Sequence, residues 1–278
     1  MTIQIPPGEE ADPTLRLPRI LCLHGGGTNA RIFRMQCRIL ERSFHSTFRL
    51  VYAEAPFAAQ PGSDVTSVYK HHGPFKAWLR CTAADPDRSA QEVVEKINLS
   101  IATAMYDDGL RGATGEWVAL LGFSQGAKVA ASILYAQQTL QQGLGERAVT
   151  WPHFRFAVLM AGRGPLVWLL PEMRSGHGSI PKGLVDAACP SISGSEPELP
   201  DDSTEHVLRL PTLHVHGLRD PGLNLHRKLL RSYCQPDSTS LVEWEGEHRV
   251  PIKTRDVAAV VDQIYALARE TCVLDSWC

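Results

Sequence analysis

Short apolar segments alternate with amphipathic segments along most of the chain. Parallel strands need long crossovers, and intervening helices can supply them. The alternation therefore predicts an α/β fold in which a mostly parallel sheet of about six strands carries helices on both faces. The runs expected to form strands are 19–25, 48–56, 116–122, 154–162, 211–217 and 239–246. The segments expected to form helices are 30–44, 93–105, 124–140, 222–233 and 254–270.

No internal repeat or linker divides the sequence, so a single domain is expected over 1–278. Two stretches lack the regular alternation. Residues 57–88 are rich in Pro and Gly, and 163–206 are expected to form an insertion that resembles a lid. The polar, proline-containing start, 1–17, is expected to be a flexible N-terminal segment.

Charge and cysteine content exclude several classes of protein. The chain has 28 Lys and Arg and 30 Asp and Glu, with no long basic block, so no nucleic-acid partner is expected. Its apolar runs are too short to cross a bilayer, and its start lacks the features of a signal peptide. Seven widely spaced cysteines without a C-x-x-C pair favour reduced thiols and a cytoplasmic location. The oligomeric state does not follow from these observations.

Gly122, Ser124 and Gly126 form a G-x-S-x-G pattern at the junction of an expected strand and an expected helix. In this setting a sharp turn lifts a serine hydroxyl above the edge of a sheet. The glycines leave room where the strand and the helix crowd the turn. A Gly/Ser helix cap is the alternative interpretation. The strand before and the helix after favour Ser124 as a nucleophile.

A nucleophilic serine needs a base, and the base needs an acid that orients it. In a sheet of this kind the acid and then the histidine are expected to follow later strands. Asp220 follows the strand expected at 211–217, and His248 follows the one expected at 239–246. We therefore expect Asp220 and His248 to complete a triad with Ser124.

Competing residues lack the strand-end position. The acids expected to be solvated loop charges are Asp201, Asp202 and Asp237. The histidines not expected in the triad are His71, His72, His153, His177, His206 and His226.

An oxyanion formed on the substrate requires hydrogen-bond donors, which backbone N–H groups can supply. Gln125, directly after the serine, is expected to provide one. The turn after the first strand is expected to provide the other, since glycines there allow a close backbone approach. Gly26 is the expected donor and Gly27 the second choice, whereas His24 is expected to be structural.

The sequence offers no convincing metal site. His214 and His216 lie on the same side of an expected strand, but no third ligand is evident. Triad chemistry needs no cofactor. We therefore expect neither a metal nor a cofactor.

Six motifs occur in order at suitable spacing: RILCLHGGGTNARIF, YAEAPF, GPFKAWLR, LLGFSQGAKVA, PTLHVHGLRDP and EGEHRVP. Together they resemble the fungal FSH-type serine hydrolases, especially the stand-alone thioesterases of polyketide clusters of the lovastatin and citrinin types. The resemblance covers about 18–268. It implies an α/β-hydrolase fold with the nucleophile at Ser124, the acid at Asp220 and the base at His248. Relatives usually carry Gly-Gly-His before the base, and Glu247 departs from that pattern.

The resemblance implies a trans-acting thioesterase that releases or edits polyketide acyl chains. The partner would be an acyl substrate, carried on the acyl carrier protein of a polyketide synthase. A general small-molecule carboxylesterase is the main alternative. A non-catalytic binding protein of this fold and a serine peptidase are further alternatives.

Aromatic residues in the two irregular stretches are candidates for the acyl pocket. They are Phe57, Phe75 and Trp78 in the first stretch and Trp168 in the second. The alternative is that these side chains cover the core without touching substrate.

Overall fold

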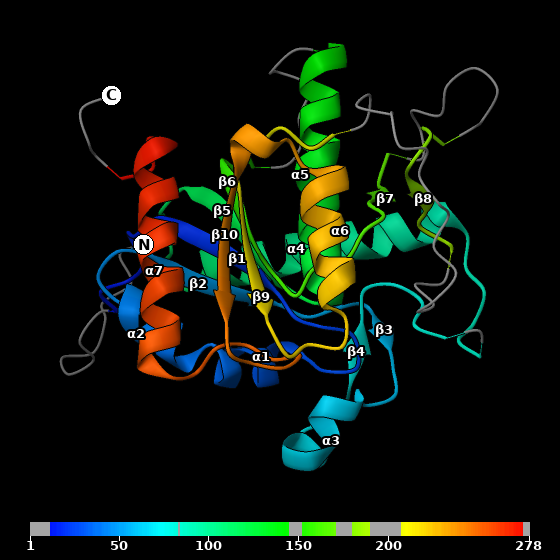
Figure 1. Ribbon diagram of the computed structural model, residues 1–278, viewed down its shortest axis with the longest axis horizontal. Coiled ribbons are helices and arrows are strands. Elements are labelled where there is room, and N and C mark those ends of the chain that lie inside the picture. Colours follow the sequence, from blue (N-terminus) through cyan, green and yellow to red (C-terminus); the bar gives the residue numbers. More distant parts are fainter. Residues whose placement is uncertain (1–11, 83, 145–151, 171–179, 190–206, 275–278) are drawn as a thin grey trace, which may run out of the picture.

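The central element of the protein is a parallel sheet. The computed structural model describes residues 12–82, 84–144, 152–170, 180–189 and 207–274 (Figure 1). Six strands pair in the order β10-β9-β6-β5-β1-β2, and every neighbouring pair is parallel. They are β1 (Arg19–Leu23), β2 (Arg49–Ala53), β5 (Trp117–Phe123), β6 (Phe156–Met160), β9 (Thr212–Gly217) and β10 (Thr239–Trp244). The predicted α/β architecture is confirmed.

Helices cover both faces of the sheet (Figure 1). One face carries α1 (Ala30–Gln36), α2 (Arg38–Phe44) and α7 (Thr254–Glu270). The other carries α4 (Ala90–Leu110), α5 (Gln125–Leu144) and α6 (Leu223–Tyr233). Successive strand residues therefore enter two separate cores: Leu21 of β1 packs toward α4 and α5, and Cys22 packs toward α1 and α7.

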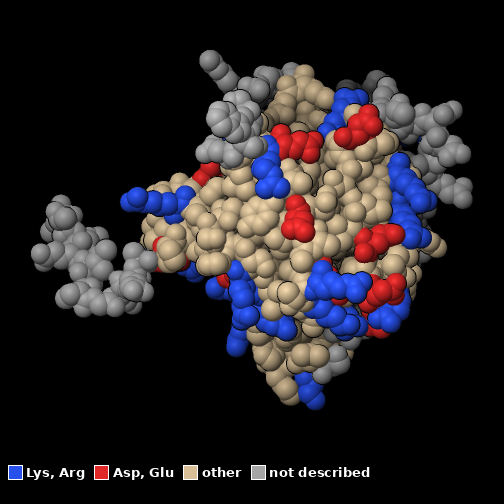
Figure 2. Space-filling model, turned by 60° about the vertical axis from the view of Figure 1, so that its left-hand side comes forward, with Lys and Arg blue, Asp and Glu red and all other residues tan. Residues whose placement is uncertain are grey.

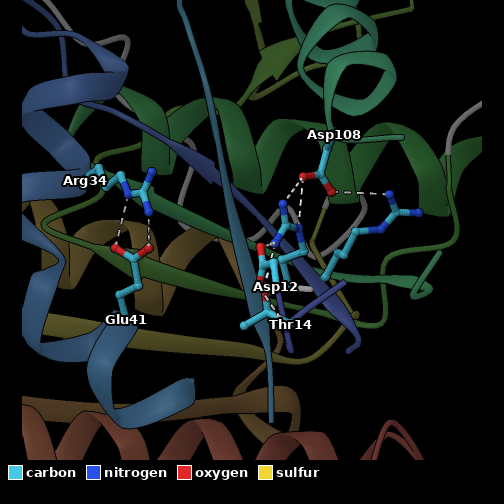
Figure 3. A network of polar contacts seen from close by, with 7 residues as sticks. Asp12, Thr14, Arg34, Glu41 and Asp108 are labelled. Carbon is cyan, nitrogen blue, oxygen red and sulfur yellow. Dashed lines mark hydrogen bonds and ion pairs between the residues drawn. The ribbon is translucent and has the colours of Figure 1, made fainter. Parts of the chain in front are cut away.

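The helix expected at 30–44 is two helices. The chain bends at Cys37, which caps the end of α1 and precedes α2. The bend lets Phe33 of α1 and Phe44 of α2 join the same core. An ion pair between Arg34 and Glu41, with 2.9 Å between nitrogen and oxygen, spans the bend (Figure 3).

The irregular stretches contain short elements that the sequence pattern did not predict. The first holds β3 (Phe57–Ala58), α3 (Ser63–Tyr69) and β4 (Lys76–Ala77), and β3 pairs with β4. The described parts of 163–206 hold β7 (Val167–Trp168) and β8 (Val185–Asp186). Elements of two residues are too short for a periodic pattern to indicate them.

The strand order places a switch point beside β1. From β1 the chain moves to β2 on one side and later to β5 on the other. Ligands of open α/β sheets bind at the carboxyl ends of the strands next to such a point. Leu23, at the end of β1, pairs in register with Gly122 of β5. The turns that hold Gly26 and Ser124 therefore lie side by side at this edge.

A buried carboxylate ties the edge strand β2 to α4. Asp108 of α4 is 1% exposed and receives hydrogen bonds from Arg19 of β1 and Arg49 of β2 (Figure 3). Arg49 also donates to Asp12 and Thr14. Residues 12–17 form hydrogen-bonded turns against the sheet. The flexibility expected for 1–17 stays a prediction, and 1–11 lie outside the described residues.

Charges of both signs lie interspersed on the face drawn in Figure 2. None of the helices in the described part of the chain is long and apolar enough to cross a membrane. Among the described residues, the free cysteines are Cys22, Cys37, Cys81, Cys189 and Cys234, as expected. Cys272 is disulfide-bonded, so the expectation of a reduced thiol is wrong for this residue.

We expect Asp108→Ala to lower the free energy of unfolding by about 3 kcal/mol, because it leaves two largely buried guanidinium groups without their carboxylate. Urea denaturation followed by circular dichroism measures the change. Glu116→Ala is the matched control, since it breaks the exposed ion pair with Arg155 and should cost less than about 1 kcal/mol. Equal costs for the two variants would contradict the structural role of Asp108.

Candidate active site

Ser124 lies in a strained turn between β5 and α5. Its φ of 53° is in the left-handed region, which a non-glycine residue adopts only at a cost of about 1–3 kcal/mol. The turn is held by a hydrogen bond of 2.8 Å from the Ser124 N–H to the Met160 carbonyl. Such strain is typical of a turn that exposes a nucleophilic side chain above the sheet.

The two glycines around the serine are required by the packing of α5 against β5 and against the end of β1. A Cβ on Gly122 would lie 2.5 Å from the backbone nitrogen of Ala127. A Cβ on Gly126 would lie 2.1 Å from the carbonyl oxygen of Leu23. Real Cβ atoms do not come this close to backbone atoms, so the predicted reason for both glycines is confirmed.

The structure brings Ser124, His248 and Asp220 together from the ends of three strands. His248 Nε2 lies 3.0 Å from Ser124 Oγ, and His248 Nδ1 lies 2.6 Å from Asp220 Oδ2. With a proton on Nδ1, the ring donates to the carboxylate and its Nε2 accepts from the serine hydroxyl. This arrangement can abstract the serine proton.

Asp220 is held as a charged acceptor inside the protein. Its side chain is buried, and Oδ1 accepts a hydrogen bond of 2.7 Å from the Gly222 N–H. Burial raises the pKa of the Asp220 carboxyl, but the hydrogen bond and charge of His248 and the Gly222 N–H outweigh it. The net pKa lies below the usual value, so the group is ionised at neutral pH.

The loops that carry the acid and the base are joined through their backbones. Leu218 N–H donates to the Trp244 carbonyl, and Arg219 N–H donates to the Gly246 carbonyl at 2.8 Å. Glu247, where this chain departs from the family pattern, has an exposed side chain that pairs with Arg249 at 3.3 Å. The departure therefore leaves His248 within reach of Ser124.

The residues that carry the expected oxyanion donors lie close to each other. A Cβ on Gly26 would lie 3.3 Å from both the Gln125 side chain and Cys81 Sγ. Gln125 is the first residue of α5, so its N–H has no acceptor within the helix. Gly27 donates its N–H to the Lys76 carbonyl at 2.9 Å. Of the two glycines considered, Gly26 is therefore the better candidate.

The side chain of Gln125 has a role that the sequence did not indicate. Its Oε1 accepts from the N–H groups of Trp78 at 2.8 Å and Leu79 at 3.2 Å. Its Nε2 donates to the Leu79 carbonyl at 3.0 Å. The residue after the nucleophile thereby fixes the segment that follows β4, and no local pattern could have revealed a partner about 46 residues away.

His24 is structural, as expected. Its Nδ1 lies 2.7 Å from the Gly25 carbonyl, and its Nε2 accepts from the Ala55 N–H at 3.0 Å. Its own carbonyl accepts from Trp78 Nε1 at 2.8 Å. It joins the turn after β1 to the end of β2 and to the irregular stretch.

The four aromatic pocket candidates differ in burial. Trp78 has no exposed surface, and Trp168 and Phe57 are also buried in the core beneath α4 and α5. The Arg88 guanidinium further covers the Phe57 ring, at 4.2 Å from its centroid. Trp78 is therefore a core residue whose indole N–H is taken up by the His24 carbonyl. Phe75 is partly exposed and can contact a ligand.

A row of histidines extends from the triad into the protein. The rings of His214, His216, His226 and His248 follow one another with centroid separations of 5.9, 5.6 and 6.0 Å. Burial lowers the pKa of His226 to about 3, so this ring is neutral at pH 7. Its Nε2 lies 3.7 Å from Asp220 Oδ2. His226 lies within α6 and not at the end of a strand, so its place beside Asp220 was not predictable from the sequence pattern.

Comparison with known proteins identifies the family. The model of the family described as serine hydrolase (FSH1) matches residues 14–260. Esterase dbaE of Emericella nidulans is 86% identical over the full length of both chains. Esterase pigG of Monascus ruber is 55% identical over 95% of this chain and 96% of its own.

A solved structure of esterase PE8 covers 92% of this chain and 95% of its own, at 16% identity and a TM-score of 0.47. The parallel sheet, the serine turn between β5 and α5 and the family match agree with the resemblance seen in the sequence. The chain belongs to the FSH1 family of serine hydrolases and has the α/β-hydrolase fold.

Proposed function

We propose that the protein cleaves acyl thioesters or esters with Ser124 as nucleophile, His248 as base and Asp220 as the orienting acid. The observation that carries this proposal is the continuous chain of contacts from Asp220 Oδ2 through both ring nitrogens of His248 to Ser124 Oγ. Membership of a serine hydrolase family supports it.

The first half of the reaction forms an acyl-enzyme. His248 Nε2 takes the proton of Ser124 as Oγ attacks the acyl carbonyl, and the carboxylate of Asp220 stabilises the charged ring. The backbone N–H groups of Gly26 and Gln125 hold the oxyanion. His248 then returns the proton to the departing thiol or alcohol.

The second half releases the acid. Water enters in place of the leaving group, His248 removes one of its protons, and the oxygen attacks the acyl carbonyl. Collapse of the tetrahedral intermediate breaks the bond to Ser124 Oγ, which recovers its proton from His248. Apart from the acyl substrate and one water molecule, the chain's own groups account for every proton that is transferred.

We propose a carrier-bound polyketide acyl chain as the substrate. The support is the resemblance of the motifs to stand-alone polyketide thioesterases, together with the esterase names of the relatives described above. Gln125 holds the segment after β4 beside the serine turn, and Phe75, which is partly exposed just before this segment, is the aromatic candidate for contact with an apolar acyl chain.

We expect Ser124→Ala to slow deacylation of an acylated carrier protein at least about a thousandfold, because it removes the nucleophile. Intact-mass analysis of the carrier measures the loss of the acyl group. Ser43→Ala is the control, since its hydroxyl contacts only the exposed turn of α2 in the described structure. Turnover by Ser124→Ala at the wild-type rate would contradict the role of Ser124. Cleavage of alkyl esters but of no thioester would favour a general carboxylesterase.

We expect Gln125→Met to lower kcat at least about tenfold and the free energy of unfolding by about 2 kcal/mol. The change keeps the backbone N–H of residue 125 but leaves the buried N–H groups of Trp78 and Leu79 without an acceptor. Ester hydrolysis and thermal unfolding measure the two effects. Gln91→Met, on the exposed face of α4, is the control. Unchanged kcat would contradict the proposed role of the segment in shaping the site.

A further inference from the structure

His226 is a buried polar side chain that the proposed reaction does not use. It lies in the first turn of α6 and is 0% exposed. Neither of its ring nitrogens has a hydrogen-bond partner among the described residues. Burying a polar group without a partner is costly, so such a group in a folded protein calls for an explanation. One explanation is an ion that binds the group and serves as its partner.

The unpartnered ring is directed at the acid of the triad. His226 Nε2 lies 3.7 Å from Asp220 Oδ2, and His248 Nδ1 lies 2.6 Å from the same oxygen. One ligand atom from each of the three residues lies within 4.8 Å of the other two. Two imidazoles and one carboxylate therefore converge from the loop after β9, from α6 and from the loop after β10.

This donor set matches the preferences of Zn²⁺. Zinc sites of enzymes use three protein ligands of these types, each about 2.0–2.2 Å from the metal. Tetrahedral geometry at such lengths separates the ligand atoms by about 3.4 Å. Two of the three observed separations, 2.6 and 3.7 Å, lie on either side of this value, and all three are within 4.8 Å, so shifts on the order of an ångström bring the ligands to zinc distances.

We propose that Asp220, His226 and His248 form an inhibitory binding site for Zn²⁺ within the triad. The metal would take the lone pairs of His226 Nε2 and His248 Nδ1 and one oxygen of Asp220. The His248 ring is 19% exposed, whereas the Asp220 and His226 side chains are fully buried. Movement of the His248 ring therefore provides the entry path.

Coordination stops the reaction by fixing the wrong tautomer of His248. A neutral imidazole that gives its Nδ1 lone pair to a metal carries its single proton on Nε2. That proton then faces Ser124 Oγ, so Nε2 cannot accept the proton of the serine. The inhibition rests on the proposed function, whereas the binding of the metal does not.

Calorimetric titration with ZnCl₂ tests the binding without any need for activity. We expect wild type and Ser124→Ala to bind one Zn²⁺ at this site, and His226→Phe to bind it at least about tenfold more weakly. Cys81→Ser is the control for a nearby thiol and should bind as wild type does. Circular dichroism checks folding, and His226→Gln replaces His226→Phe if the latter does not fold.

Ester hydrolysis tests the inhibition. We expect Zn²⁺ to inhibit wild type at concentrations that match its Kd, EDTA to reverse the effect, and His226→Phe to need at least about tenfold more metal, relative to its own metal-free rate. Equal binding or inhibition of wild type and the His226 variant would overturn the proposal, as would no binding by wild type at about 1 mM. An inactive wild type that binds Zn²⁺ through His226 would support the metal site and contradict the proposed function.

Discussion

The close packing of β1, β5 and α5 around the turn at Ser124 determines the geometry of the site. The Gly126 Cα lies so near the carbonyls at the end of β1 that no larger residue fits. This contact fixes the start of α5 beside the turn that holds Gly26. The Met160 carbonyl, at the end of β6, accepts a hydrogen bond from the Ser124 N–H and so holds the strained serine. The hydroxyl, the free N–H of Gln125 and the glycine turn are thereby fixed in one place before any ligand binds.

The remaining parts of the site are attached to this turn by hydrogen bonds. The Gln125 side chain fixes the segment after β4, and His24 joins that segment to the turn after β1. On the other side, the joined loops after β9 and β10 set His248 within 3.0 Å of Ser124 Oγ. The buried charge of Asp220 is compatible with this arrangement because two donors satisfy its oxygens.

The strands and the serine turn were predictable because apolar runs and the G-x-S-x-G pattern are local sequence signals. The acid and the base were predictable because they follow later strands in a fixed order. Inner strands such as β5 and β6 are buried apolar runs, and the ends of parallel strands meet at one edge. The side-chain partners of Gln125, the burial of Trp78 and the approach of His226 to Asp220 were not predictable. Each depends on contacts between segments far apart in the chain, which periodicity does not encode.

The central claim is that Ser124 is activated by His248. Reaction with a fluorophosphonate probe, followed by intact-mass analysis and peptide mapping, tests it most directly, because the probe reacts with an activated serine whatever the acyl substrate. The account predicts a single adduct on the peptide that contains Ser124, formed at least about a thousandfold more slowly in His248→Ala. An adduct on another residue, or labelling at the same rate in His248→Ala, would contradict it.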